Sequence, residues 1–232
     1  MSDPSVIVKV PHGSSDGHLE APRGTRLEGV NFSGGAKAVG LIRVAANVAD
    51  TETVTIGSDV YEFDRAANGV TAGRIAVTAH ADDTPAAATN ALISKINAQG
   101  TEPITAIDHS DNVIILVADA VGAVTDALAE AMGGANNTID PAMAGGAAAG
   151  NLRVLVTKRV PTAVEVALGL LVVACPFTPR LVQVSAQTTS SGALIAWDGG
   201  WTLDTTNNLV KIDNGGAVDW ATTSTLNIVV WE

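Results

Sequence analysis

Apolar and polar residues alternate at every second position in the last third of the chain. The alternation runs through residues 182–187 and again through residues 225–230. Successive side chains of a β-strand point to opposite faces, so this period predicts strands with one buried face. Clusters of Gly, Asn, Asp and Ser separate the apolar runs at intervals of roughly a dozen residues, as in small sandwiches. We therefore expect residues 151–232 to form an antiparallel β-sandwich or small barrel.

Residues 46–150 combine strand and helix signals. Two β-rich runs, residues 54–56 and 60–63, flank a Gly-Ser-Asp turn and predict a hairpin. A helix is expected to begin at Pro85, because Thr84 and the two preceding aspartates supply capping oxygens, and to end at Gly100. Further strands are expected at residues 75–79, 104–107 and 113–117, a short helix at 125–132, and a Gly/Ala-rich connector at 144–150. The fold class is therefore α+β, mainly β, with one main helix in a small α+β domain.

The first 45 residues differ from the rest in charge and composition. Residues 1–45 carry a net charge of +1, whereas the other 187 residues carry −12. Pro and Gly recur through this stretch and prevent regular elements from growing. We expect an extended N-terminal arm that is ordered against another surface. Its partner-contact candidates are Val6, Ile7, Val8, Arg23 and Arg26.

The apolar content of the chain comes from small side chains. It has 38 Ala and 28 Val against 8 aromatic residues. Small-molecule pockets are usually lined by aromatic and precisely placed polar side chains, so this composition disfavours an enzyme. The net charge of −11 also disfavours binding to nucleic acid phosphates.

Cysteine usage and targeting signals limit the cellular context. Cys175 is the only cysteine, so the chain has no intrachain disulfide. The first four residues, Met-Ser-Asp-Pro, lack the basic start of a secretory signal. The longest apolar run, residues 166–177, is shorter than the roughly 20 residues of a membrane-spanning helix. We expect a protein made in the cytoplasm that has no membrane partner.

Two polar clusters contain residue types that catalysis or metal binding uses. The first, His80 with Asp82 and Asp83, offers metal ligands, but the aspartates are better explained as caps of the helix that follows. The second, Asp-His-Ser-Asp at residues 108–111, is better explained as a turn, because triad members come from separate elements. Cys175 lies in an apolar run without a neighbouring base, as buried inert thiols do. We expect no catalytic, cofactor-binding or metal-binding residues.

All four tryptophans lie in the last part of the chain. A unit of about 80 residues has a marginal core of its own, so a partner subunit is expected to bury some of its aromatic rings. The subunit-interface candidates are Phe177, Trp197, Trp201, Trp220 and Trp231.

Two segments resemble proteins of tailed bacteriophages. Residues 50–57, 60–63, 86–97, 112–117, 120–122 and 143–146 resemble a unit that recurs in phage virion structural proteins. The C-terminal segment is similar to the β-domain of phage capsid decoration, or cement, proteins. Its carrying residues are Ala-Cys-Pro-Phe-Thr-Pro-Arg at 174–180, Ala-Trp-Asp-Gly at 196–199, Ile-Asp-Asn-Gly at 212–215 and Asn-Ile-Val-Val-Trp at 227–231.

The resemblance implies a virion protein that is added to the outer surface of an icosahedral head and holds capsomers together. Its partners would be the major capsid protein and further copies of itself, in a homotrimer. In that reading residues 46–150 project outward, and residues 151–232 dock and trimerise. An acidic body suits this outward location, because DNA phosphates repel it in the interior.

Two alternatives stay open. One is a head-fibre, tail or baseplate subunit, because the middle unit also occurs there. The other is a carbohydrate-binding surface module that stacks a sugar on Trp197 or Trp201.

Overall fold

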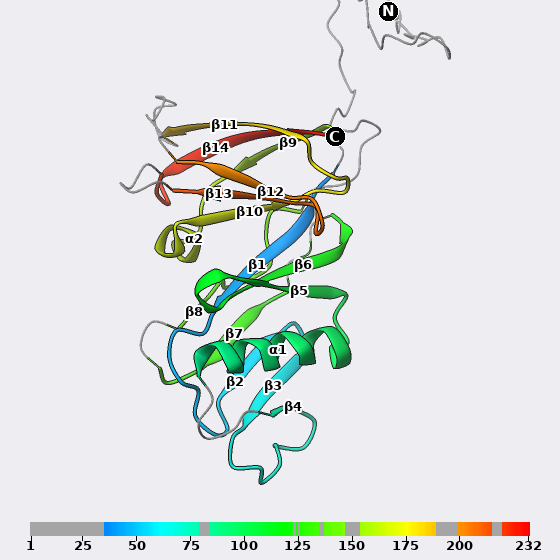
Figure 1. Cartoon of the computed structure of the whole chain (residues 1–232), viewed down its shortest axis with the longest axis vertical. Coiled ribbons are helices and arrows are strands. Elements are labelled where there is room, and N and C mark those ends of the chain that lie inside the picture. The colour runs from blue at the N-terminus through cyan, green and yellow to red at the C-terminus, as the bar shows by residue number, and fades with distance from the viewer. Residues whose placement is uncertain are drawn as a thin grey trace, which may run out of the picture. The chain divides into compact units, whose positions relative to one another are not determined.

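The computed structural model describes residues 35–78, 84–122, 124, 126–134, 137–146, 154–188, 199–214 and 220–232. Within these ranges the chain is mainly β, with strands in three sheets and two α-helices (Figure 1). The expected α+β, mainly β class is confirmed. The arm candidates, Val6, Ile7, Val8, Arg23 and Arg26, lie outside the described residues.

The largest sheet has seven strands, and every pair in it is antiparallel. Its order is β12-β13-β10-β1-β6-β5, and β8 also pairs with β1. The strands are β12 (Trp201–Asp204), β13 (Leu209–Asp213), β10 (Leu170–Ala174), β1 (Lys37–Arg43), β6 (Val113–Val121), β5 (Ile104–His109) and β8 (Thr138–Ile139). The sheet therefore combines strands from both sides of residue 150.

Two smaller sheets lie beside this one. The four-stranded sheet runs β4 (Ile75–Thr78), β3 (Asp59–Asp64), β2 (Thr53–Ile56) and β7 (Leu128–Ala131). The three-stranded sheet runs β11 (Leu181–Thr188), β14 (Ser224–Trp231) and β9 (Val154–Arg159). All pairs in these two sheets are antiparallel except β3 with β4, which is parallel.

The alternation of side chains along each strand divides the interior into three cores. The first lies between the four-stranded sheet, helix α1 (Pro85–Gln99) and one face of β1, β5 and β6. The second lies between the three-stranded sheet and one face of β10 and β13, so these two sheets form a sandwich. The third core lies on the other face of the seven-stranded sheet and contains residues of β1, β6, β10 and β13. The sheet is curled around this core.

The helices begin and end where their sequences provide caps. The side chain of Thr84 accepts a hydrogen bond from the backbone N–H of Ala87 at the start of α1. Helix α2 (Ala163–Leu168) begins with a capping box, in which Thr162 and Glu165 each accept a hydrogen bond from the other's backbone N–H. It ends at Gly169, whose φ of 64° is left-handed and favours glycine.

Several expectations about individual elements are confirmed. The expected hairpin consists of β2 and β3, and the expected main helix is α1. The expected strands at 75–79, 104–107 and 113–117 correspond to β4, β5 and β6, and the two alternating runs correspond to β11 and β14.

Other expectations are corrected by the structure. Residues 128–131, expected within a short helix, form strand β7 because they pair with β2 in register. Residues 163–168, within the part of the chain expected to form a β-sandwich or small barrel, form helix α2 because the capping box fixes a helical start there. Residues 37–43, assigned to the arm, form the central strand β1, whose partners on β6 and β10 are at least 70 residues away.

Candidate functional site

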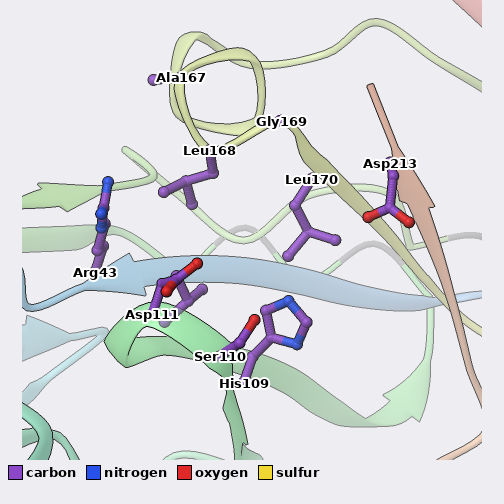
Figure 2. A pocket seen from close by; sticks show the side chains of 10 residues that line it. Arg43, His109, Ser110, Asp111, Ala167, Leu168, Gly169, Leu170 and Asp213 are labelled. Atoms are coloured by element: carbon purple, nitrogen blue, oxygen red, sulfur yellow. The ribbon is translucent and has the colours of Figure 1, made fainter. Parts of the chain in front are cut away.

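A hollow opens at one end of the curled face of the seven-stranded sheet (Figure 2). Its volume is about 360 Å³. The apolar part of its wall comes from Val113, Leu168 and Leu170, which belong to or pack against the third core. The polar part comes from Arg43, from residues 109–111 and from Asp213. Four segments far apart in the sequence therefore supply the side chains around one cavity.

The connection between β5 and β6 places His109, Ser110 and Asp111 at the edge of this hollow. A 3-10 turn (Ser110–Asn112) joins the two strands. Asp111 and Asn112 have φ values of 60° and 59°, a left-handed conformation that Asn and Asp tolerate better than most residues. The tight turn is as expected for residues 108–111.

The charges around the hollow are mixed. Figure 2 shows the side chains of Arg43 and Asp213 at opposite sides, with His109 between them. Burial, and then the positive charge of Lys211, lower the pKa of His109 below its ordinary value of 6.5. The ring is therefore neutral at pH 7, where it can donate one hydrogen bond and accept another.

Helix α2 forms one wall of the hollow, and a buried polar network holds it in place. Arg159 Nη2 lies 2.7 Å from Glu165 Oε1, and both side chains are buried. Thr162 Oγ1 donates to Asp140 Oδ1 at 2.7 Å, and Asp140 Oδ2 accepts the backbone N–H of Leu41. Burial raises the pKa of Asp140 and of Glu165. The positive charge of Arg159 and the hydrogen bonds to each carboxylate lower these pKa values, but by less than burial raises them. The network connects α2 with β9 and with β1.

A second candidate surface is the side of the three-stranded sheet that points away from the second core. In register across β11, β14 and β9, Leu181 lies opposite Trp231, which lies opposite Val154. In the next outward row, Val229 lies opposite Val156. Leu181 and Val156 are 56% and 51% exposed, and the other three are half-buried. We call these five residues the apolar outer face.

The apolar outer face carries little charge. The strands β9, β11 and β14 contain no Asp or Glu, although the whole chain has a net charge of −11. Beyond the five apolar residues, the outward positions are mostly Gln, Ser, Thr and Asn, with Lys158 as an exposed base. Apolar side chains surrounded by neutral polar ones are typical of a surface that binds another protein.

The aromatic interface candidates are dispersed rather than gathered. Trp220 is buried in the second core, and Phe177 packs against it from its edge. Trp201 is 39% exposed on β12, the edge strand of the seven-stranded sheet, whereas Trp231 belongs to the apolar outer face. Trp197 lies outside the described residues. Burial in the core of its own chain leaves Trp220 unable to contact a partner.

Sequence reasoning missed the hollow and every member of the apolar outer face except Trp231. The hollow depends on contacts between residues about 60 to 170 positions apart, for which the sequence gives no signal. The sequence does contain a signal for the outer face. Val229 and Trp231 occupy outward positions of β14, where alternation predicts polar residues, and Val154 and Val156 do so in β9. A strand that is apolar in both phases predicts that both of its faces are covered.

Other possible sites receive less support. No group of three or more His, Cys, Asp or Glu side chains that could hold a metal ion occurs in the described ranges. His80, Asp82 and Asp83 lie outside them. Cys175 is buried between the two sheets of the sandwich, and burial raises its pKa to about 12.

The described helices include none that is long and apolar enough to cross a membrane. Comparisons of the chain with protein-family models, with curated proteins and with solved structures found no match.

Proposed function

We propose that this chain is a structural protein of a tailed-phage virion, which binds the outer surface of the icosahedral head and holds capsomers together as a homotrimer. The observation that carries the proposal is the apolar outer face. Five apolar side chains lie there in register on a sheet whose other side already covers a core. Their exposure is unfavourable in water, and a second copy of the chain would remove it.

The charge distribution supports a second copy as the occupant of this face. Two chains with a net charge of −11 repel one another across most of their surfaces. The strands of the outer face contain no acid, so like-charge repulsion is smallest when copies approach through it. The surface is therefore suited to self-association of an acidic protein.

Attachment to the head is assigned to the N-terminal arm, as its sequence suggests. Residues 1–36, which precede β1, carry a net charge of −1, and residues 6–10 have the alternation of a short strand. Such a segment can add a strand to an exposed sheet edge of the major capsid protein. Contacts of three arms in one trimer add through effective concentration, so each one can be weak.

The trimer is tested with a charge placed on the apolar outer face. Val156→Glu introduces an unpaired carboxylate at a half-exposed position, which leaves folding nearly unaffected but opposes docking. The matched control is Ala129→Glu, at an exposed, outward position of β7 in the four-stranded sheet. Sedimentation should give three times the chain mass of 23.5 kDa for the natural chain and the control, and a lower mass for Val156→Glu. A monomeric natural chain would contradict the trimer.

Head attachment is tested on phage particles. Heads that lack this protein should recover it on their shell when the natural chain is added, as seen by cryo-electron microscopy. Val8→Asp in the arm should reduce this occupancy, because the charge interrupts the apolar alternation of Val6, Val8 and Val10. Binding to tails or baseplates with bare heads would favour the fibre or tail alternative instead.

A further inference from the structure

The chain contains two Asn-Gly sequences, Asn68-Gly69 and Asn214-Gly215. In such a sequence the backbone nitrogen of the glycine can attack the side-chain carbonyl carbon of the asparagine, because glycine has no Cβ that hinders the approach. The reaction is spontaneous and converts the asparagine into an acid. The surroundings of the two asparagines decide which of them can react in the folded protein.

The first Asn-Gly sequence lies at the surface. Asn68 and Gly69 belong to the connection between β3 and β4, outside the three cores, and both are exposed. A methyl group on the Cα of Gly69 would have no heavy atom within 4 Å, so the space around this residue is open. A five-membered ring between the two residues therefore has room to form.

The side-chain amide of Asn68 is held by one long hydrogen bond. Its Nδ2 donates to Asp50 Oδ2 at 3.4 Å, and its Oδ1 accepts no hydrogen bond from a described residue. The attacking nitrogen is also held at the surface, because the N–H of Gly69 donates to Asp64 Oδ2 at 3.2 Å. Water can replace both exposed bonds, so the nitrogen of Gly69 and the amide of Asn68 can approach one another.

The second asparagine has the opposite surroundings. Asn214 is 7% exposed, and both polar atoms of its amide are bound to the backbone of Trp220. Nδ2 donates to the carbonyl of Trp220 at 3.1 Å, and Oδ1 accepts from its N–H at 2.9 Å. Rotation of this amide toward Gly215 would break two buried hydrogen bonds, so folding protects Asn214.

We propose that Asn68 is a site of spontaneous deamidation and that Asn214 is protected from it. The nitrogen of Gly69 forms a bond to Cγ of Asn68 and loses its proton, and the Nδ2 group takes up a proton and leaves as ammonia. Water then opens the succinimide at either of its carbonyl carbons, which leaves aspartate or isoaspartate at position 68. No oxidant or reductant takes part. This modification does not depend on the virion role.

The product places a new negative charge beside two existing ones. Asp50 Oδ1 accepts the backbone N–H groups of Arg65 and Ala66 at 2.8 and 3.0 Å, and Asp64 Oδ1 accepts that of Asn68 at 3.0 Å. These two carboxylates anchor the connection between β3 and β4. A carboxylate in place of the Asn68 amide repels Asp50 and no longer donates to it. We therefore expect deamidation to loosen this connection.

The experiment incubates the full-length protein in warm, mildly alkaline buffer and measures peptide masses after tryptic digestion. Trypsin releases Asn68 on the peptide of residues 66–74 and Asn214 on that of residues 212–232. The first peptide should gain about one dalton, because an amide becomes an acid. It should do so at least about tenfold faster than the second, because a buried site reacts only when the chain opens. In denaturant the two rates should be similar, and an unincubated sample gives the starting masses.

Two variants connect the reaction to Asn68. Asn68→Gln should abolish the mass gain of the first peptide, because attack on a glutamine side chain needs a larger ring. Asn68→Asp reproduces one product and should speed amide hydrogen exchange of residues 65–71 about threefold or more. Exchange in α1 should stay unchanged and serves as the control.

Several outcomes overturn the proposal. One is a first peptide that keeps its mass in the folded protein while it gains mass in the denatured chain. Equal gains of both peptides in the folded protein, or a gain that persists in Asn68→Gln, would also overturn it. Unchanged hydrogen exchange in Asn68→Asp would contradict the loosening of the connection.

Discussion

The three-stranded and four-stranded sheets cover their cores in the same way but differ on their outward faces. In the four-stranded sheet the outward positions are mostly small or polar, such as Thr53, Thr55, Ala129 and Ala131, with Val60 as an exception. In the three-stranded sheet the corresponding positions include the Leu, Val and Trp side chains of the apolar outer face. Because the architecture of the two sheets is similar, it is the polarity of the outward side chains that distinguishes a surface facing water from one suited to a protein partner.

The two sheets also differ in how they use charge. On the four-stranded sheet Glu62 pairs with Arg74 at 2.6 Å, and the arginine side chain is 37% exposed. The arginine of the three-stranded sheet, Arg159, instead points inward to Glu165, and both are buried. In the first pair only the arginine is partly exposed, above a buried glutamate, whereas in the second pair both members are buried.

The largest expected effect comes from breaking the inward pair. Arg159→Met should lower the free energy of unfolding by about 3–5 kcal/mol, because it leaves the buried Glu165 carboxylate uncompensated. Arg74→Met should cost about 1 kcal/mol or less, since its pair is partly screened by water. Urea denaturation measures both. Equal losses would show that the two regions do not differ in this respect.

Adjacent residues of β9 separate the two sides of the three-stranded sheet. Leu155 is fully buried, so Leu155→Ala should cost about 2–5 kcal/mol of unfolding free energy. Val156 points outward, and Val156→Ala should cost less than about 0.5 kcal/mol in a monomer. Both values follow from chemical denaturation at low protein concentration. A large loss for Val156→Ala would mean that its own chain already covers this face.

Acid sensitivity should come from the four-stranded region. Burial alone raises the pKa of Asp59, but hydrogen bonds from Thr101 and Glu102 outweigh burial and lower it. A lowered folded-state pKa contributes stability above the unfolded value of about 3.9, and this stability is lost as pH falls through the folded value.

Asp59→Asn should therefore cost about 1–2 kcal/mol at pH 7, because neutral acceptors replace charged ones. The difference from the natural chain should shrink as pH falls below about 4. Unfolding curves at a series of pH values measure it. A difference that stays constant down to pH 3 would contradict this role of Asp59.

The smallest expected effect concerns Cys175 in the second core. Burial raises its pKa to about 12, so the folded protein presents almost no thiolate at pH 8. A thiol-specific reagent should give no reaction in native buffer and one thiol per chain in denaturant. Rapid reaction of the native protein would show that the two sheets of the sandwich separate readily.

Elements formed by neighbouring residues could be predicted from the sequence. The β2–β3 hairpin needs only a two-residue turn between β-rich runs, and α1 carries its own start and stop signals. Helix α2 also carries them, in Thr162, Glu165 and Gly169, but the surrounding Val and Leu residues favoured a strand. The local cap decides the conformation there.

Elements that depend on distant partners could not be predicted. Strand β1 was assigned to the arm because net charge and glycine content divide the sequence near residue 45. Its burial follows from pairing with β6 and β10, at positions 113–121 and 170–174. Residues 128–131 likewise form strand β7 because they pair with β2, more than 70 residues earlier in the chain.

By itself, the sequence determined the class of fold, the main helix, the local hairpin and the burial of Cys175. These follow from spacing, caps and apolar surroundings within a few residues. Only the tertiary structure decided that β1 is central, that strands from both sides of residue 150 share one sheet, and that Arg43 and Asp213 line the same hollow. Pairing between distant strands is selected by register and burial over the whole chain, which local periodicity does not encode.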